Sequence, residues 1–426
     1  MNRIDFILEE DIKQHVGACL KVIGVGGAGG NAVNSMVKNN TMESIEFILA
    51  NTDAQALALS PVKHKIQIGA KVTKGLGAGS NPDVGRRSAE EDIEEIAQHI
   101  KNTDILFLTG GLGGGTGTGG LPVIAQVARE MGVLSVAIVT KPFTFEGKRR
   151  MNHAEEAIKY LRTVVDTLII VPNQKLLELV DPKISMLDAF ALSNSILYQA
   201  IKGISDIITQ PGHINVDFAD VRSVMKDMGM AIMGTGRAEG EGRARQAALR
   251  AISSQLLENV SINGARGVLI NITGNIDLGL HEINEAASVV YDLVSEDANI
   301  ILGSVIDSNI GNEIMVTVIA TGFEGDVIGK QVQKKEARAL HYDDQALLSD
   351  AVTLQQTKAR PFFNDRVPRG AHYTHEEPEA VAQEFNVERK KQSVEMFDAH
   401  DLDTPTFLRK NIHLKKDLTR EDISKI

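Results

Sequence analysis

The chain has 426 residues, of which 43% are apolar and 24% are charged, and its formal net charge is −11. This length suits two packed domains with some irregular sequence, and the acidic balance disfavours nucleic acid as a general partner. The single cysteine, Cys19, excludes an intrachain disulfide and is typical of a reducing cytosol. We expect no membrane insertion, because no apolar stretch is long enough to span a bilayer. We expect no secretory or transit peptide, because residues 9–11 are acidic.

The first motif is a strand that runs into glycines. Leu20–Val25 predicts a buried strand, Gly26–Asn31 a glycine-rich turn, and the residues up to about Lys38 a helix. The spacing Gly24-x-Gly26-x-x-Gly29 also fits the dinucleotide fingerprint, which keeps open a Rossmann oxidoreductase that binds NAD(P) or FAD. In that alternative, Asp53 after the second strand would hold a ribose.

A second glycine-rich stretch, Thr109–Gly120, follows the apolar run Ile105–Leu108 and precedes a predicted helix over Leu121–Met131. Strand, glycine loop and helix together aim backbone N–H groups and a positive helix end at a phosphate. No Gly-Lys-Ser/Thr follows, so the stretch is not a Walker A loop. A flexible linker is the alternative, but a linker is not bracketed by a buried strand and a helix. Two such loops on parallel strands suit a triphosphate better than a dinucleotide.

Further strands and helices alternate along the first half of the chain. Residues 71–82 predict a flexible loop, and residues 83–100 predict one amphipathic helix. Apolar strands are predicted at 133–139 and 167–171, the first of them followed by a loop over 140–150. This alternation predicts an α/β fold with a doubly wound, mostly parallel sheet. Ligands bind at the carboxyl ends of such strands, where the following residues converge: Gly26, Asn51, Gly111, Lys141 and Asn173.

A long central helix is predicted next. Ser185 and Asp188 have the spacing of a capping box, and the helix should run to about Thr209, where Pro211 and Gly212 end it. Its apolar residues lie on several faces, so we expect it to be buried between two layers or domains. Beyond it, a strand within 227–236, a helix over 243–257 and strands at 267–274, 300–306 and 314–320 predict a smaller α+β domain.

The segment Gly113–Gly119, Gly-Gly-Gly-Thr-Gly-Thr-Gly, resembles the signature of the tubulin/FtsZ superfamily, and the similarity to bacterial FtsZ proteins covers about Lys21–Gly322 plus a short segment near the C-terminus. The resemblance implies a self-assembling cytoskeletal GTPase of bacterial cell division. Its subunits would stack head to tail and hydrolyse GTP at the interface between them. A protein that binds GTP and assembles without turnover remains an alternative.

The resemblance also implies which residues bind the nucleotide. Loop 71–82 would lie against the γ-phosphate, Glu146 would accept hydrogen bonds from the ribose, and Arg150 would lie near the phosphates. The implied GTP/GDP-binding residues are Gly26, Gly27, Ala28, Gly29, Gly30, Asn31, Gly77, Ala78, Gly111, Gly114, Gly115, Thr116, Gly117, Thr118, Gly119, Pro142, Glu146, Arg150, Asn173, Phe190, Asn194 and Ser195. Mg²⁺ would be held mainly through the phosphates, with a monovalent cation left open. No His/Cys grouping has metal-ligand spacing.

Base recognition departs from the family pattern at one position. The ring of Phe190 would stack near guanine, and Asn194 would read its edge, but Ser195 stands where the family usually has aspartate. An aspartate accepts from both N1–H and the exocyclic amine of guanine and so rejects adenine, whereas serine carries no charge to do this. We still expect GTP, with selectivity either weaker or resting on Asn173 and Asn194.

Catalysis is expected from the loop after the central helix. On the residues alone, a catalytic role for Asn215, Asp217 and Asp220 and a purely structural one are equally consistent with the sequence. In the structural alternative they form an Asx turn and a helix cap, with Asp220 capping the next helix. The resemblance implies that this loop enters the pocket of the next subunit, where Asp217 and Asp220 orient the attacking water and Asn215 supports them. Phosphoryl transfer needs such positioning, and the first half of the chain offers no obvious carboxylate for it. A head-to-tail interface is heterologous and produces filaments.

The C-terminal part loses its periodicity after Gly322, and we expect disorder until about residue 400. Asp401–Lys410 resembles the family's C-terminal peptide. It would bind membrane-tethering and regulatory division proteins (FtsA-, ZipA- and MinC-like) and place the protein at mid-cell in the cytoplasm. Residues 411–426 extend past that peptide and receive no role. The predicted divisions are 1–15 extension, 16–184 nucleotide-binding domain, 185–210 central helix, 211–322 α+β domain with catalytic loop 211–220, 323–400 linker, and 401–426 peptide and tail.

Overall fold

The structure is a computed structural model, and it describes residues 17–323 except 40, 41, 43, 179, 181, 182, 211, 255–261 and 263. The predicted N-terminal extension, the linker beyond residue 323 and the C-terminal peptide therefore lie outside the described residues. So does Pro211, the predicted end of the central helix.

Six parallel strands form the first part of the sheet, in the spatial order β3-β2-β1-β4-β5-β6. The order reverses between β1 and β4, which is where open α/β sheets bind ligands. The prediction of a doubly wound parallel sheet is confirmed. The strands are β1 (Leu20–Val25), β2 (Ile45–Asn51), β3 (His64–Gln67), β4 (Ile105–Gly111), β5 (Leu134–Lys141) and β6 (Thr167–Pro172).

Helices cover both faces of these strands because the strands are apolar on both faces. In β1, Leu20 and Val22 belong to one core cluster with α1 and α9, whereas Ile23 and Val25 belong to a second cluster with α6 and α7. The helices of this half are α1 (Gly26–Asn39), α2 (Ala54–Leu59), α3 (Ala70–Thr73), α4 (Pro82–Glu91), α5 (Ile93–Ile100), α6 (Thr116–Glu130), α7 (Lys148–Val164) and α8 (Asn173–Leu177), with a 3-10 turn η2 (Thr144–Glu146).

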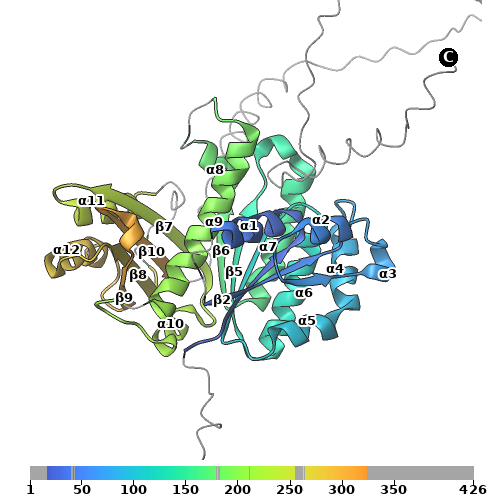
Figure 1. Cartoon of the computed structure of the whole chain (residues 1–426), viewed down its shortest axis with the longest axis horizontal. Helices are drawn as coiled ribbons and strands as arrows, with labels where there is room; N and C mark the ends of the chain where they lie inside the picture. The colour runs from blue at the N-terminus through green and yellow to red at the C-terminus, as the bar shows by residue number, and fades with distance from the viewer. Residues whose placement is uncertain are drawn as a thin grey trace, which may run out of the picture. The chain divides into compact units, whose positions relative to one another are not determined.

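The predicted central helix is α9 (Met186–Thr209). Its N-cap is Ser185, whose hydroxyl oxygen accepts from the backbone N–H of Asp188 at 3.1 Å. The helix contacts β5 and β6 as well as β8 and β9, and Figure 1 shows it between the two groups of strands. The helix lies between the two groups of strands, as expected, and its later turns are buried there (Leu197, Ile201 and Ile204). In its first turns, however, Met186, Leu187 and Phe190 are exposed.

The second half of the chain extends the same sheet. Strand β7 runs parallel to β6, β10 is antiparallel to both β7 and β8, and β8 is parallel to β9, which gives ten strands in all among the described residues. A third apolar cluster packs helices against these strands. The elements are α10 (Phe218–Met225), β7 (Gly229–Glu239), α11 (Arg243–Ile252), β8 (Gly267–Gly274), α12 (Leu280–Tyr291), β9 (Asn299–Ile306), η4 (Ser308–Ile310) and β10 (Glu313–Thr321).

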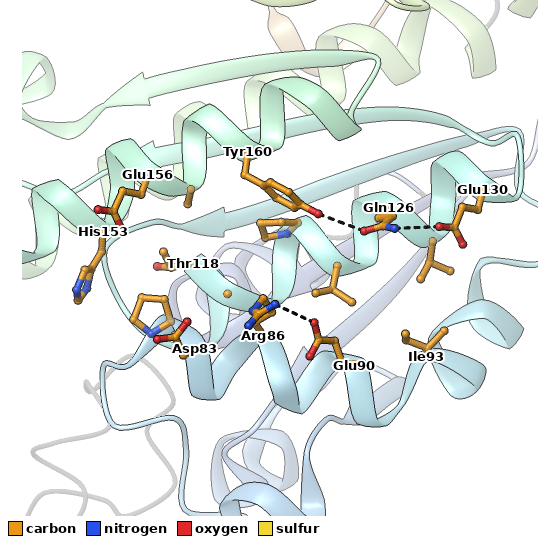
Figure 2. Close-up of a pocket in the computed structure, with 16 residues that line it drawn as sticks. Asp83, Arg86, Glu90, Ile93, Thr118, Gln126, Glu130, His153, Glu156 and Tyr160 are labelled. Carbon is orange, nitrogen blue, oxygen red and sulfur yellow. Dashed lines mark hydrogen bonds and ion pairs between the residues drawn. The ribbon is translucent and has the colours of Figure 1, made fainter.

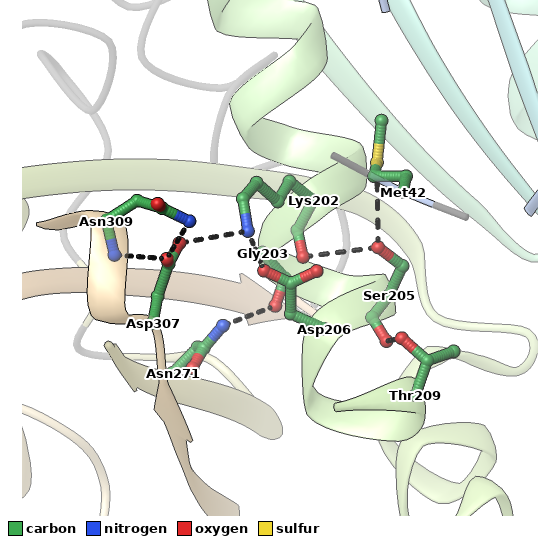
Figure 3. A network of polar contacts seen from close by, with 9 residues as sticks. All are labelled: Met42, Lys202, Gly203, Ser205, Asp206, Thr209, Asn271, Asp307 and Asn309. Carbon is green, nitrogen blue, oxygen red and sulfur yellow. Dashed lines mark hydrogen bonds and ion pairs between the residues drawn. The ribbon is translucent and has the colours of Figure 1, made fainter. Parts of the chain in front are cut away.

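Polar side chains join α9 to the end of β9 (Figure 3). Lys202 forms an ion pair with Asp206 one turn on and lies 3.7 Å from the carboxylate of Asp307. Asn271 on β8 donates to the carbonyl of Gly203 at 3.0 Å. Asp206 is only 2% exposed, so its charge depends on Lys202 as a partner. The central helix is thus tied by charge and hydrogen bonds to the second half of the chain.

Several helix boundaries differ from the sequence prediction. Helix α1 begins at Gly26, so the predicted turn over Gly26–Asn31 forms its first turns, and α11 ends at Ile252 rather than at residue 257. Residues 83–100 form two helices, because the carboxylate of Asp92 accepts from the N–H of Gly69 at 2.6 Å and the chain breaks there. The helix predicted from Leu121 begins at Thr116, so that the threonines and glycines of the signature are its first turns. The packing of α6 against α4 explains why glycines occupy these first turns. A Cβ on Gly119 would lie 2.0 Å from the carbonyl oxygen of Pro82, so only glycine lets α6 approach α4.

Candidate functional site

The two glycine-rich stretches place two helix N-termini in contact. Helix α1 begins at Gly26, and α6 begins at Thr116 with Gly115 as a cap that has no side chain. A Cβ on Gly26, which has φ +72°, would lie 2.8 Å from the backbone nitrogen of Gly117, and one on Gly111 would lie 2.7 Å from Cβ of Ala28. These close approaches, which only glycine permits, bring both loops together at the carboxyl ends of β1 and β4.

The N-termini of α1 and α6, with the glycine loops that lead into them, are called the cradle below. Their backbone is suited to binding an anion. The first N–H groups of a helix have no acceptor within the helix, and the helix dipole makes that end positive. Here no side chain caps α6, and Gly114 has open space around its Cα. Gly27 and Ala28 on the facing helix are exposed. Two such termini side by side can bind the phosphates of one nucleotide.

Hydrogen bonds of threonine hydroxyls stabilise the shape of the cradle. The hydroxyl of Thr118 accepts from the backbone N–H of Gly113 at 2.9 Å, and that of Thr116 lies 2.7 Å from the hydroxyl of Thr52. Both predicted threonines therefore hold the loop in shape. Thr52 was not predicted, although its place directly after the carboxyl end of β2 is a signal that could have found it.

The third predicted loop also reaches the cradle. A Cβ on Gly115 would lie 2.8 Å from Cβ of Ala78, and the N–H of Gly77 donates to the carbonyl of Thr52 at 3.3 Å. From the other side, the backbone carbonyl of Arg150 lies 2.8 Å from where Gly113 would carry a Cβ. The structure thus gathers residues from loops predicted far apart in sequence.

A group of aromatic and charged residues lies beside α9. The ring of Phe143 contacts that of Phe190 edge to face, with centroids 5.3 Å apart. The carboxylate of Glu146 accepts from the N–H of Phe143 at 2.9 Å and pairs with Arg150 at 2.5 Å. Pro142 is buried next to them. These residues, expected at the ribose and phosphates, form a connected group around η2.

The residues expected at the base lie on α8 and the first turns of α9. Asn173 is 4% exposed, and its side-chain oxygen accepts from the hydroxyl of Ser193 at 2.8 Å. Ser195 donates its own hydroxyl to the carbonyl of Leu192 at 2.8 Å, while Phe190 is exposed. Ser193 was not predicted, but it orients the amide of Asn173. Its position three residues after Phe190, on one side of the helix, is the only signal for it.

The predicted catalytic residues do not lie in this cradle. Asp217 caps α10 by accepting from the N–H of Asp220 at 2.8 Å, and the side chain of Asn215 accepts from the N–H of Gly212 at 3.0 Å. The cap that the residues alone allowed is thus present, with Asp217 rather than Asp220 as the capping residue. Most of α9 separates this loop from the residues expected at the base. The segment from Asn194 to Thr209 is about 20 Å long at 1.5 Å per residue.

The loop and the cradle belong to opposite ends of the parallel strands. Thr167, the first residue of β6, donates its hydroxyl to the carbonyl of Met225, the last residue of α10. Helix α10 therefore lies at the amino ends of the strands, whereas the glycine loops follow the carboxyl ends.

Asp53 is the residue expected to bind a ribose in the oxidoreductase alternative. In the structure its side chain caps α2, because it accepts from the backbone N–H groups of Gln55 and Ala56.

A cavity of about 500 Å³ lies between α4, α6 and α7 (Figure 2). Of the predicted nucleotide-binding residues, only Thr118 and Gly119 line it. Several of its polar side chains pair with one another, including Tyr160 with Gln126 at 3.3 Å and Arg86 with Glu90 at 3.3 Å. The cavity shares Thr118 and Gly119 with the cradle, but most of its lining comes from later turns of the helices, including Glu90, Gln126 and Tyr160.

Two kinds of site are absent from the described residues. No group of three or more His, Cys, Asp or Glu side chains there is placed to hold a metal ion. None of the helices in that part of the chain combines the length and apolar character needed to cross a membrane.

Two family models match the chain. Residues 19–181 match the GTPase domain of the Tubulin/FtsZ family, and residues 229–324 match the C-terminal domain of the FtsZ family. A cell division protein FtsZ of Coxiella burnetii is 53% identical over 305 residues, which cover 72% of this chain and 79% of that protein. The FtsZ of Pseudomonas aeruginosa is 53% identical over 317 residues, covering 74% and 80%.

Solved structures give the same result. An empty FtsZ dimer from M. jannaschii has a TM-score of 0.69 and 42% identity, and the match covers 76% of this chain and 93% of that one. A GTPγS-bound protofilament of CetZ2 from Haloferax volcanii has a TM-score of 0.62 at 21% identity, covering 77% and 99%, and supports the fold alone.

Proposed function

Because this chain belongs to the FtsZ family of cell-division proteins and carries its tubulin-like GTPase domain, we propose that it is a cytoskeletal GTPase whose active site is completed by a second copy. Residues 16–184 would bind GTP, and the loop over 211–220 of a neighbouring subunit would supply the catalytic groups. The oxidoreductase alternative is set aside by the family membership and by Asp53, which serves as a helix cap.

One observation carries this proposal. The phosphate cradle lies at the carboxyl ends of the parallel strands, and α10 with its capping Asp217 lies at the amino ends. Because the loop and the cradle lie at opposite ends of the strands, we infer that the loop reaches the γ-phosphate of a second chain stacked end to end rather than that of its own chain. Such a contact joins two different surfaces, does not close on itself, and therefore builds a filament.

The chemistry divides between the two subunits. Backbone N–H groups of α1 and α6 would neutralise phosphate charge, and this positioning is most of what phosphoryl transfer needs. Asp217 and Asp220 of the neighbour would orient the attacking water, with Asn215 holding the loop. Mg²⁺ commonly binds through substrate phosphates with few protein ligands, and we propose that it does so here.

The base end would read guanine through the side chains of Asn173 and Asn194, with Phe190 stacking nearby. Support comes from the burial of Asn173 and its hydrogen bond with Ser193, which fix the amide in one orientation. Glu146 would accept from the ribose hydroxyls, and Arg150, which pairs with Glu146, would lie near the phosphates.

Two variants of Asp217 test the proposal. Asp217→Asn keeps a good N-cap and removes the charge, whereas Asp217→Ala removes both and should cost about 1 kcal/mol of stability. We expect phosphate release by either variant to fall at least tenfold, while GTP binding and sedimentable polymer persist. The Asn variant should also unfold at the wild-type temperature. Wild-type turnover by Asp217→Asn would contradict the catalytic role, and a wild-type chain that polymerises without releasing phosphate would favour the scaffold alternative.

We further propose that Asp401–Lys410 binds membrane-tethering and regulatory division proteins, which would bring the filaments to the mid-cell division site. The support is the sequence resemblance of that segment, with apolar Leu402, Phe407 and Leu408 as anchors of the kind that fold on binding. The segment lies outside the described residues.

A further inference from the structure

The loop that carries Asn215 and Asp217 is seated on strand β9. The N–H of Ile214 donates to the hydroxyl oxygen of Ser304 at 2.8 Å, and the N–H of Ser304 donates back to the carbonyl of Ile214 at 3.1 Å. Ser304 is 2% exposed. One buried residue of β9 therefore holds the middle of the loop through two hydrogen bonds.

The loop packs tightly against β9 around Ile214. A Cβ on Gly212 would lie 1.6 Å from the carbonyl oxygen of Ser304, and one on Gly303 would lie 3.2 Å from a methyl group of Val216. On one side of Ile214 the two backbones are in direct contact, and on the other the side chain of Val216 lies against Gly303. The loop can leave β9 only by breaking the hydrogen bonds to Ser304.

The N-cap of α10 does not fix the position of the loop relative to β9. Asp217 fixes its own position relative to Asp220, but a cap holds only the first turn of its helix. Helix α10 itself is anchored near its C-terminal end, where the hydroxyls of Thr167 and Thr321 donate to the carbonyls of Met225 and Val224. The contact with β9 fixes the part of the loop that precedes Asp217. A displacement of about 1 Å in a catalytic group can lower a rate about 100-fold, so this contact bears on hydrolysis.

We propose that Ser304 is a positioning residue for GTP hydrolysis, which presents the loop of one subunit in fixed geometry to the nucleotide of the next. This inference rests on the proposed function. Ser304 touches no nucleotide; it acts through Ile214 on the residues that follow it. Preorganisation of this kind places reacting groups before the partner arrives.

Thr and Val at position 304 make a matched pair, because they have the same shape and differ only in the hydroxyl. We expect Ser304→Thr to keep most of the turnover per polymerised subunit and Ser304→Val to lose at least tenfold. GTP affinity should be equal in the two variants, since the cradle and Ser304 belong to different parts of the subunit. Turnover is compared per polymerised subunit, because the loop lies at the proposed contact between subunits. Turnover of Ser304→Val within twofold of Ser304→Thr would overturn the inference.

The double variant separates positioning from a general structural role. If Ser304 acts through the catalytic loop, Ser304→Val should lower the residual rate of Asp217→Asn no further, because groups that act as a unit are non-additive. A further tenfold loss, or a parallel loss of GTP binding, would show a merely structural role and overturn the inference.

The two proposals fail in different ways. If Asp217→Asn keeps the wild-type rate, the proposed function fails and this inference fails with it. If Asp217→Asn is inactive and Ser304→Val remains active, only the role of Ser304 is wrong.

Discussion

Ser195 shows how a single residue can limit base selection. Its hydroxyl donates to the carbonyl of Leu192 within the same helix, so its proton is committed and only oxygen lone pairs remain for a ligand. A hydroxyl oxygen can accept from one of the two guanine N–H groups, but it lacks the charge and the paired oxygens of a carboxylate. In the proposed function, discrimination between the bases would then rest on the amides of Asn173 and Asn194.

We predict that Ser195→Asp increases the preference for GTP over ATP by tenfold or more, because hydrogen bonds to a charged acceptor are stronger than neutral ones. Competition of ATP against labelled GTP measures the preference directly. Ser195→Ala serves as the control and should leave the ratio near the wild-type value. An unchanged ratio in Ser195→Asp would show that position 195 does not face the base edge.

The tie between α9 and β9 makes a prediction at the level of elements (Figure 3). Burial raises the pKa of Asp206, although the charge of Lys202 works against it. Burial would lower the pKa of Lys202, but the charge and hydrogen bond of Asp206 outweigh it and raise that pKa. A carboxyl group with a raised pKa in the folded state costs stability as the pH rises, so Asp206 needs Lys202 most at neutral and alkaline pH.

Lys202→Met should therefore destabilise the fold in a pH-dependent way. We expect a loss of about 3 kcal/mol at pH 8, where an unpaired carboxylate is left buried. The loss should be smaller at pH 5, because the pKa of Asp206 rises further in the variant and the group takes up a proton more readily. Denaturant unfolding at the two pH values measures this.

The control for this prediction is the double variant Lys202→Met/Asp206→Asn, which removes both charges and should recover most of the stability. Equal losses at both pH values, with no recovery in the double variant, would mean that Lys202 contributes by packing alone.

Element boundaries show what sequence patterns can and cannot give. Strands β1 and β8 and helix α9 match their predicted bounds, because apolar runs and the Ser185 cap are local signals. The start of α6 was placed too late, since glycine disfavours helices and only contact with α4 makes it necessary there. The break at Asp92 depends on a hydrogen bond to Gly69, 23 residues away, which no local pattern contains. Helix α12 was not predicted at all.

The candidate site, like the element boundaries, could be predicted from the sequence only in part. Glycine runs after strands located the cradle, because any parallel sheet gathers the residues at its carboxyl ends. The supporting contacts, such as Thr52 on Thr116 and Ser193 on Asn173, join residues from different elements and become visible only in the fold. The roles of Asp217 and Asp220 came from the family resemblance and stay a prediction.

For the whole molecule, the separation of cradle and loop links chemistry to assembly. Each subunit has the cradle at the carboxyl ends of its parallel strands and Asp217 with α10 at the amino ends. In the proposed function, hydrolysis would require stacking, and stacking of unlike surfaces would continue into a filament. In this account, nucleotide turnover and filament length are controlled by the same contact.

Phosphate release per chain, measured from dilute to concentrated protein at saturating GTP, tests this account most directly. We predict almost no release below the concentration at which polymer first sediments. Above it, release should rise in proportion to the polymerised protein. A rate per chain that stays constant down to dilutions without sedimentable polymer would contradict the account, because each chain would then hold a complete active site.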